Sequence, residues 1–513
     1  MSRVRKLIMA FHLMYLVYIF TKNNGNILIF WVKHMSNGYK EMAVNWVSEN
    51  EKLLVEVHDK IWGWAEVGLL EFKTGKLLAD ILEENSFDVE RGVAMMPSAF
   101  VATYGSGTPV IGVMGELDAL PGISQKAVPY REPLVEGGAG HGCGHNSYAT
   151  TALGGALAVK TVMEAENMSG TIKCFGCPAE ETLVGKVFMV RDGVFDGVDA
   201  CLGHHPGSSN TAGLGSGNAM NSVKFEFFGS ASHAAGSPEQ GISAMDAVEL
   251  MNIGVNYMRE HVVQEARMHY VVEDGGHEPN VVPPYARSWY YVRAPVRDLV
   301  DRYYERILRI ADGADLMVGT THQVEFLTGV HNGMPNRPLA ELVVANMKEI
   351  GAPTYNDDEL KFAKELAKSV PREQKIDKLR RLEQFRPGAM KLVDVDLDTN
   401  IYDPFGEERK GGGGSSDVAD VAWNIPTQQF STTYTIVGAP GHSWQNVASC
   451  GTSIGHKSTL FASKVMSTSI IDLLTKPELL KKVKDDWNER MKGLIYKSPL
   501  PSDLKPPLHQ LKK

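Results

Sequence analysis

Nine residues, GAGHGCGHN at 138–146, combine two histidines, one cysteine and four glycines in front of an apolar helical stretch. Imidazole and thiolate are ligands that zinc prefers, and glycine lets the backbone bend close to a site. A helix N-terminus and a metal cation both lower the pKa of a thiol. We therefore expect Cys143 and His145, at the start of the helix, to bind a metal ion.

Acids and histidines follow four apolar runs that are predicted as strands. The runs are 110–114, 171–176, 198–203 and 432–437. The residues that follow them are Glu116, Asp118, Glu180, Glu181, His204, His205 and His442. In open α/β sheets, ligands bind at the carboxyl ends of the strands. We therefore expect these side chains to converge in one crevice, although they are far apart in the sequence.

Five of the side chains named so far, taken together, are too many for one closed tetrahedral site. They are Cys143, His145, Glu181, His205 and His442. They suit two adjacent divalent ions, about 3.5–4 Å apart, that share a bridging ligand. The alternative is a scatter of unrelated core and surface histidines. Glu180 and Glu181 are neighbours on extended chain and point in different directions, so that one can bind metal while the other acts as general base.

The elements around these residues alternate between helices and strands. Residues 51–68 predict an amphipathic helix, and 147–165 carry small and apolar residues at helical spacing. This alternation indicates an α/β fold with a mixed, largely parallel sheet and helices on both faces. We expect this catalytic domain in two halves, 45–216 and 333–480, followed by a C-terminal tail, 481–513.

Residues 217–332 show a different pattern and are expected to form an inserted domain. The predicted order is strand, helix, strand, strand, helix, strand, which is typical of an α+β, ferredoxin-like domain. Three polar residues in its non-helical parts could reach the crevice: His233, Asn280 and Arg293. From spacing alone, an exposed loop residue or a strand-end charge is the simpler interpretation of each.

Composition excludes some classes of protein. With 43% hydrophobic and 22% charged residues, the chain has the composition of a soluble globular protein, and 513 residues suggest two or three domains. The net charge of −9 argues against a nucleic-acid partner. Five cysteines, an odd number in a long chain, favour reduced thiols and a cytoplasmic location over a disulfide framework.

The first 34 residues are the exception to this soluble character. Arg3, Arg5 and Lys6 precede a mostly apolar run, as in a signal peptide or a short membrane anchor. The run is shorter than the roughly 20 residues that span a bilayer, and no small-residue cleavage site follows it. The alternative is that 1–34 is a non-native extension and that translation starts at Met35 or Met42.

Eight motifs together resemble one enzyme family. They are GELDALPG, GHGCGHN, PAEET, GHHP, GSASHAAGSP, PNVVP, SSDVADVAW and PGHSWQ. They are similar to motifs of the di-metal aminoacylase, carboxypeptidase and amidohydrolase family, in its branch with a cysteine ligand. The resemblance covers about residues 45–470. The motifs SSDVADVAW and HSWQ favour the aminobenzoyl-glutamate type of that branch.

The resemblance implies a metal ligand set. Cys143 would bridge two divalent ions, zinc or manganese. His145 and His205 would complete the coordination of one ion, and Glu181 and His442 that of the other.

The resemblance also implies the remaining roles. Glu180 would be the general base, and Asp118 would hold a metal ligand from behind. The inserted domain would dimerise as a lid and send His233, a catalytic residue, and Asn280 towards an active site. Arg293 would bind a substrate carboxylate.

The activity implied is hydrolysis of the amide bond in p-aminobenzoyl-glutamate or a related N-acyl amino acid, by a homodimer or by a heteromer with a related subunit. One alternative is a general N-acyl amino acid deacylase or dipeptidase. The other is a catalytically silent binding component of a heteromeric hydrolase.

Overall fold

The structure is a computed structural model that describes residues 26–406 and 413–508, with side chains described from residue 38 onward. Residues 1–25 lie outside the described residues, so the expected signal, anchor or extension at 1–34 stays a prediction. Among the helices of the described ranges, none is both long enough and apolar enough to cross a membrane.

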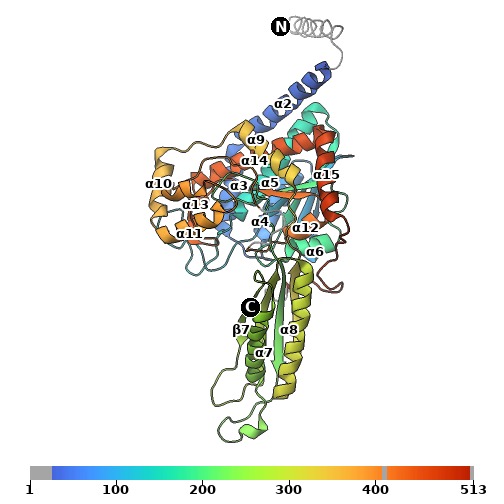
Figure 1. Cartoon of the computed structure of the whole chain (residues 1–513). Coiled ribbons are helices and arrows are strands. Elements are labelled where there is room, and N and C mark those ends of the chain that lie inside the picture. Colours follow the sequence, from blue (N-terminus) through green and yellow to red (C-terminus); the bar gives the residue numbers. More distant parts are fainter. Residues whose placement is uncertain (1–25, 407–412, 509–513) are drawn as a thin grey trace, which may run out of the picture.

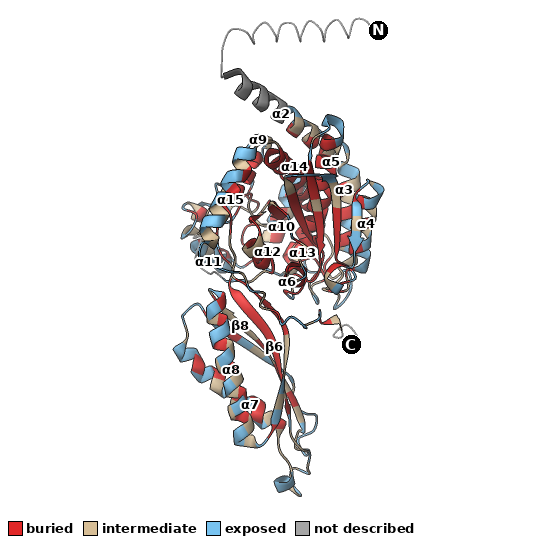
Figure 2. Ribbon diagram, turned by 90° about the vertical axis from the view of Figure 1, so that its right-hand side faces the viewer, coloured by how far each residue is buried: buried red, intermediate tan, exposed pale blue. Residues whose placement is uncertain are grey.

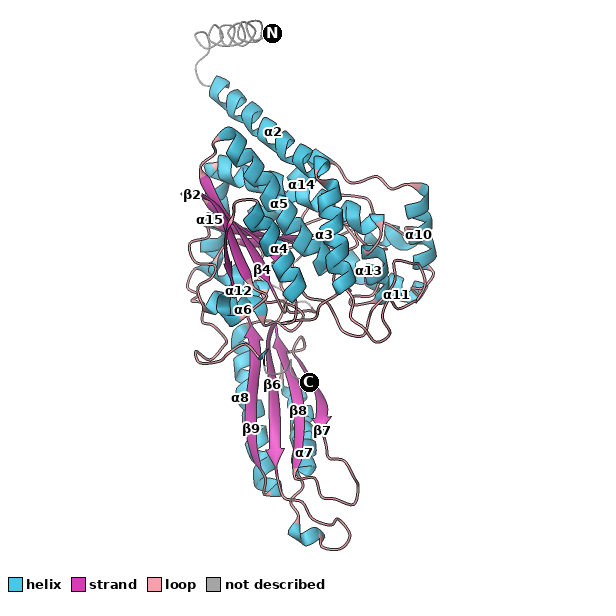
Figure 3. Ribbon diagram, turned by 180° about the vertical axis from the view of Figure 1, so that it is seen from behind, coloured by secondary structure: helices cyan, strands magenta, loops and turns pink. Residues whose placement is uncertain are grey.

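A six-stranded mixed sheet forms the centre of the larger domain (Figure 3). Its strands are β1 (Asp88–Arg91), β2 (Phe100–Ser106), β3 (Val110–Glu116), β4 (Gly170–Cys177), β5 (Ala200–His204) and β10 (Thr427–Phe430). The spatial order is β1-β2-β4-β3-β5-β10. Strands β4, β3, β5 and β10 are parallel, whereas β1 and β2 pair antiparallel at one edge. The predicted mixed, largely parallel sheet is confirmed.

Helices cover both faces of this sheet, as expected (Figures 1 and 2). The helices packed in the larger core are α2 (Asn26–Glu49), α3 (Glu51–Trp64), α4 (Phe72–Glu84), α5 (His145–Glu166), α9 (Arg337–Ile350), α14 (Ser453–Thr475) and α15 (Pro477–Met491). Those in the core of the opposite face are α6 (Gly185–Arg191) and α12 (Val418–Asn424). Val113 belongs to the first core and its neighbour Met114 to the second, because successive side chains of a strand point to opposite faces.

Three further helices pack beside these layers. They are α10 (Asp357–Ala367), α11 (Arg372–Glu383) and α13 (Trp444–Cys450). A short 3-10 helix, Ala389–Asp394, follows α11.

Residues 217–332, called the insert below, form a separate layer of four antiparallel strands and two helices that projects from the larger domain (Figure 3). The elements are β6 (Ala219–Phe228), α7 (Ala244–Met258), β7 (Arg267–Asp274), β8 (Tyr285–Ala294), α8 (Arg297–Val318) and β9 (Thr321–Val330). The strand order is β7-β8-β6-β9. The order of elements along the chain is the one that the sequence predicts.

The strand predicted at 432–437 does not form. The last strand of the sheet, β10, ends at Phe430, and the chain then makes only isolated bridges, Thr433 with Gly207 and Ser431 with Thr211. Threonine side chains in this segment make hydrogen bonds to other parts of the chain. Thr433 Oγ1 donates to the carbonyl oxygen of Asp398 at 2.7 Å. The segment before His442 is therefore an irregular connection and not a strand.

Candidate metal centre

Three parallel strands deliver polar side chains to the same edge of the sheet. Strand β3 ends at Glu116, β4 at Cys177 and β5 at His204. Asp118, Glu180 and His205 follow these ends within a few residues. The parallel pairing of β3 with both β4 and β5 brings the three chain segments together.

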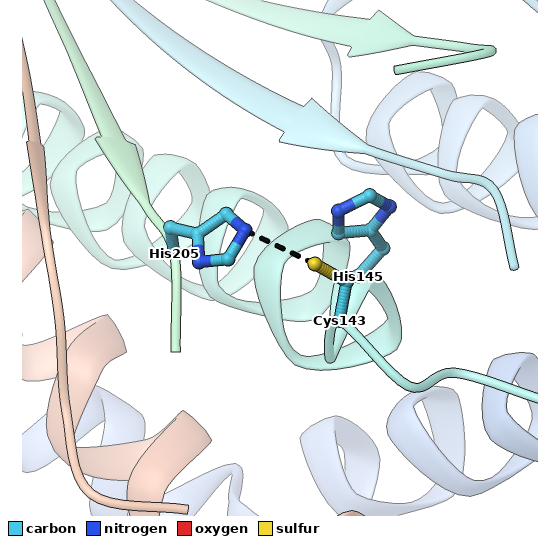
Figure 4. A group of neighbouring side chains, drawn as sticks. All are labelled: Cys143, His145 and His205. Atoms are coloured by element: carbon cyan, nitrogen blue, oxygen red, sulfur yellow. Dashed lines mark hydrogen bonds between the residues drawn. The ribbon is translucent and has the colours of Figure 1, made fainter. Parts of the chain in front are cut away.

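Cys143 and His145 approach this edge from the start of α5. Gly144 lies between them as the residue before the helix, with a φ of +75° in the left-handed region. A Cβ atom at this position would lie 2.6 Å from Cγ of Pro206. Glycine is therefore required for both the backbone conformation and the close approach of the chain to His205. Figure 4 shows the result, in which Cys143 Sγ lies 3.4 Å from His205 Nε2.

The five expected metal ligands meet in two overlapping sets. The ligand atoms of Cys143, His145 and His205 lie within 4.8 Å of one another, and so do those of Cys143, Glu181 and His442. Cys143 belongs to both sets, as a bridging ligand must. His442 Nε2 lies 3.5 Å from Glu181 Oε2, and His442 adopts a strained left-handed φ of +52°. We call these five residues the metal group.

The donor atoms of the metal group fit divalent cations. His145 Nε2 and Glu181 Oε1 are buried and make no hydrogen bond, although the Glu116 carboxylate lies 3.1 Å from His145 Nε2. Buried polar atoms without a hydrogen bond are costly, and a metal ion would satisfy both. Burial, with the nearby Glu181 and Glu180 carboxylates, raises the pKa of the Cys143 thiol to about 12, although His145 opposes this shift. The helix start alone therefore does not ionise this thiol, and a bound cation would have to do so.

Asp118 positions two residues of the metal group by hydrogen bonds. Its carboxylate accepts a hydrogen bond from His145 Nδ1 at 3.0 Å and another from the backbone N–H of Glu181 at 3.0 Å. The backbone oxygen of Asp118 also lies 2.9 Å from His145 Nδ1. These contacts place the ring proton on Nδ1 and leave the lone pair of Nε2 free for a metal.

A fully buried ion cluster, which the sequence did not predict, adjoins the metal group. Lys186 Nζ lies 2.9 Å from Glu116 Oε1 and 2.7 Å from Asp417 Oδ1, and its backbone N–H donates to Asp417 Oδ2 at 2.7 Å. Glu116 Oε2 in turn lies 3.1 Å from His145 Nε2. Glu116 and Asp417 stand in recognisable motifs, but Lys186 carries no motif signal. The cluster fixes three segments whose charges would be costly to bury unpaired.

Glu180 lies inside this network and faces the metal group. Burial and the charge of Glu116 raise its pKa well above the ordinary range of a carboxyl group. Its Oε2 atom lies 3.9 Å from His145 Nε2. Ala179, the preceding residue, has a left-handed φ of +54°, so the chain turns sharply before the two glutamates. A carboxyl group whose affinity for protons is raised in this way is suited to take and return a proton.

Other candidate residues lie outside the metal group. His204 is buried, with Nδ1 3.1 Å from Thr151 Oγ1 and Nε2 2.8 Å from Thr432 Oγ1, so both ring nitrogens have partners. Cys174 and Cys177 are free buried thiols of β4.

His233 and Asn280 stand far from the metal group of their own chain. Strand β6 points away from the larger domain, and the segments 229–243 and 275–284 form the tip beyond it (Figure 3), called the insert tip below. His233 and Asn280 are both exposed there. They are neighbours, because the backbone N–H of Ala234 donates to the carbonyl oxygen of Asn280 at 2.9 Å.

Arg293 occupies the opposite end of the insert. It pairs with Met220 at the start of β6, where the insert joins the larger domain. Its Nε atom is buried and makes no hydrogen bond, and its guanidinium lies 5.4 Å from the centre of the Tyr291 ring. Arg293 therefore has donor capacity to spare for a ligand.

A cavity of about 410 Å³ adjoins His205. Its lining includes Gly213, Gly215, Met334, Val418 and Phe430, and no aspartate, glutamate, lysine or arginine is among the residues that line it. Gly213 and Gly215 have no heavy atom within 4 Å of an added Cβ, so both face open space. The cavity suits an uncharged group next to the metal group.

Residues 112–446 match the peptidase family M20/M25/M40, and this range contains the whole metal group. The chain belongs to this family. Membership identifies it as a hydrolase of amide bonds.

Known relatives extend over nearly the whole chain. The chain is 36% identical over 471 residues to one of the component chains of p-aminobenzoyl-glutamate hydrolase of Escherichia coli, and the match covers 90% of this chain and 97% of that protein. It is 24% identical to the Xaa-Arg dipeptidase of Homo sapiens, over 87% of this chain and 91% of the relative.

A solved structure shares the fold. The crystal structure of an aminobenzoyl-glutamate utilization protein from Klebsiella pneumoniae matches with a TM-score of 0.57 at 18% identity, over 84% of this chain and 97% of that chain.

Proposed function

We propose that this protein hydrolyses the amide bond between an uncharged acyl group and an amino acid, with p-aminobenzoyl-glutamate as the first candidate substrate. The observation that carries the proposal is the metal group, with its shared cysteine, beside a cavity that lacks charged side chains. The name of the Escherichia coli relative supports the choice of substrate.

The metal group would hold two divalent ions, zinc or manganese. His145 and His205 would complete one site and Glu181 and His442 the other, with Cys143 common to both. Such ions polarise a carbonyl group and lower the pKa of water.

The chain's own residues would handle the proton and the substrate. Glu180 would take the proton of the attacking water and deliver it to the leaving amine. Arg293 would pair with the carboxylate of the amino acid, and Asn280 would help to bind it. His233 would donate a hydrogen bond to the oxyanion that forms at the carbonyl.

The exposed insert tip suggests that His233 and Asn280 serve the active site of a neighbouring chain in an oligomer. A homodimer is the simplest assembly, because closed two-fold dimers are the commonest oligomers. A heteromer is the alternative, because two relatives of this chain carry the names of two different subunits of one p-aminobenzoyl-glutamate hydrolase. Five free cysteines suit the reducing cytoplasm, which we retain as the proposed location.

A substrate panel tests this proposal against its alternatives. The purified protein, loaded with zinc or manganese, is assayed on p-aminobenzoyl-glutamate, acetyl amino acids and dipeptides. We expect the highest kcat/KM on an aromatic acyl-glutamate. A preference for dipeptides or for acetyl amino acids would favour a general deacylase or dipeptidase. Absence of turnover until a related chain is added would favour the silent binding component.

The cavity next to His205 is expected to hold the acyl group. Gly215→Leu should fill the open space at Gly215 and lower kcat/KM for benzoyl substrates by at least about tenfold, while acetyl substrates lose less. One methylene more or less in a hydrophobic pocket changes kcat/KM by about 10–200-fold. The matched control is Gly63→Leu, at an equally open position in α3. Equal losses on both substrate types would contradict this placement of the acyl group.

A further inference from the structure

A second cluster of metal-ligand side chains lies outside the metal group. His58 and Asp59 project from α3, and His456 projects from the first turn of α14. Their ligand atoms lie within 4.8 Å of one another. His58 Nδ1 lies 3.2 Å from Asp59 Oδ1, and His456 Nε2 lies 2.7 Å from the same oxygen. Around a tetrahedral zinc ion, with ligands about 2.0–2.2 Å from the metal, ligand atoms lie about 3.3–3.6 Å apart, so the two hydrogen-bonded contacts need to lengthen by less than about 1 Å to admit the ion.

The protonation states of this cluster suit a cation. Burial lowers the pKa of His58, so its imidazole is neutral near neutral pH. Partial burial would raise the pKa of Asp59, but hydrogen bonds from His456 and His58 outweigh it and hold that pKa below its ordinary value. A neutral imidazole and an ionised carboxylate are the forms that bind metal.

The cluster is anchored on one side and open on the other. The His58 side chain is fully buried, whereas the side chains of Asp59 and His456 are 48% and 22% exposed. An ion and its water ligands can therefore enter from solvent, as an open three-ligand zinc site requires.

Behind His58, a buried amide can adapt to a metal. Asn146 Nδ2 lies 2.9 Å from His58 Nε2, and Cys450 Sγ donates to Asn146 Oδ1 at 3.2 Å. Rotation of the Asn146 amide by 180° would let Oδ1 accept from a proton on Nε2 and leave the Nδ1 lone pair for the ion. The two amide orientations are nearly equal in shape.

We propose that His58 Nδ1, Asp59 Oδ1 and His456 Nε2 bind one further zinc ion, with water completing the coordination. This ion is separate from the metal group. It links α3 to α14, and residues of both helices pack in one core with α5, the helix that begins at His145.

Metal analysis of the full-length protein tests the proposal. The protein is equilibrated with zinc and freed of unbound ions. Wild type is expected to retain one more ion per chain than Asp59→Asn or His456→Gln. The matched control, His277→Gln, replaces an exposed histidine of the insert and should retain the wild-type number. Equal zinc content in wild type and both variants would overturn the site.

The design also separates this site from the metal pair. If the metal group binds two ions, the count falls from three to two. If the metal group binds none, it falls from one to zero, and the difference of one ion still stands.

Cobalt provides a second readout. A cobalt ion bound by thiolate gives an intense sulfur-to-metal absorption band, whereas a site of imidazole and carboxylate ligands gives only weaker visible bands. In a Cys143→Ser background, cobalt should produce visible bands without the sulfur band, and His456→Gln in that background should remove the share of these bands that belongs to one ion per chain. A sulfur band in Cys143→Ser would mean that another cysteine, with Cys450 the nearest, takes part, and would contradict the proposed ligand set.

Discussion

The metal group and the insert tip hold their polar residues in opposite ways. The former is assembled from strand ends, a helix start and the irregular segment before His442, and Asp118 fixes two of its ligands by hydrogen bonds to His145 and Glu181. At the insert tip, His233 is exposed, and its Nδ1 accepts only from nearby backbone N–H groups, those of Ala235 at 3.2 Å and Gly236 at 3.0 Å. The first region is complete within one chain. The second presents its side chains outward, as a surface made for another molecule would.

The largest expected effect comes from removing the shared ligand. Cys143→Ser should lower the metal content below two ions per chain and reduce turnover by more than about 100-fold, since even residues that only support metal ligands are worth about 10–100-fold. Metal content and kcat are measured on the same preparation. The control is Cys174→Ser, in the core strand β4. Two tightly bound ions in Cys143→Ser would contradict a bridging role.

The insert tip can be tested by mixing two inactive proteins. His233→Ala and Glu180→Gln are each expected to be nearly inactive. In a mixed dimer, one active site carries both defects and the other carries neither. Random exchange makes half of the dimers mixed, so about a quarter of wild-type activity should return if the protein forms symmetric dimers.

A matched mixture provides the control for this experiment. Glu180→Gln combined with Cys143→Ser should show no recovery, because each chain then carries a defect in its own active site. Absence of recovery in the first mixture, with exchange of chains demonstrated, would mean that His233 acts in its own chain or not at all.

A smaller effect is expected where the insert rejoins the larger domain. His331 follows β9, and its Nε2 lies 2.9 Å from the carbonyl oxygen of Lys497. Burial lowers its pKa from 6.5 to about 4. Between these two values the unfolded chain binds a proton that the folded chain does not. Stability is therefore fully present above pH 6.5 and is lost as the pH falls towards 4, by up to about 1.4 kcal/mol per pH unit for this histidine.

Denaturant unfolding at several pH values checks this prediction. His331→Gln should flatten the loss of stability between pH 6.5 and 4, whereas His277→Gln, at an exposed position, should leave it unchanged. An unchanged slope in His331→Gln would place the acid sensitivity elsewhere.

The sequence predicted the strands that lead to the metal group better than it predicted the contacts that support this group. Apolar runs before Glu116, Glu180 and His205 predicted strands whose carboxyl ends meet, and the structure has these strands. The periodicity of the insert likewise predicted its order of elements. Both are local signals, because apolar periodicity follows from the faces that a strand or helix buries.

The features that the sequence did not predict depend on contacts between distant segments. The residues 432–437 include three threonines, one isoleucine and one valine and favour a strand, but the Thr433 hydroxyl group donates to the carbonyl oxygen of Asp398, 35 residues away in the sequence. The actual strand β10 carries Gln428 and Gln429, whose polarity hides it. Lys186 stands within an ordinary helical pattern, and only the fold shows its pairing with Glu116 and Asp417.

The adjacent glutamates offer the most direct test of the central claim, that one acid moves the proton while its neighbour binds metal. Metal content and turnover are measured for Glu180→Gln and, as control, for Glu181→Gln. The account predicts that Glu180→Gln keeps two ions per chain and loses about 100- to 10,000-fold in turnover, whereas Glu181→Gln loses metal. Near-normal turnover in Glu180→Gln, or loss of its metal, would contradict the account.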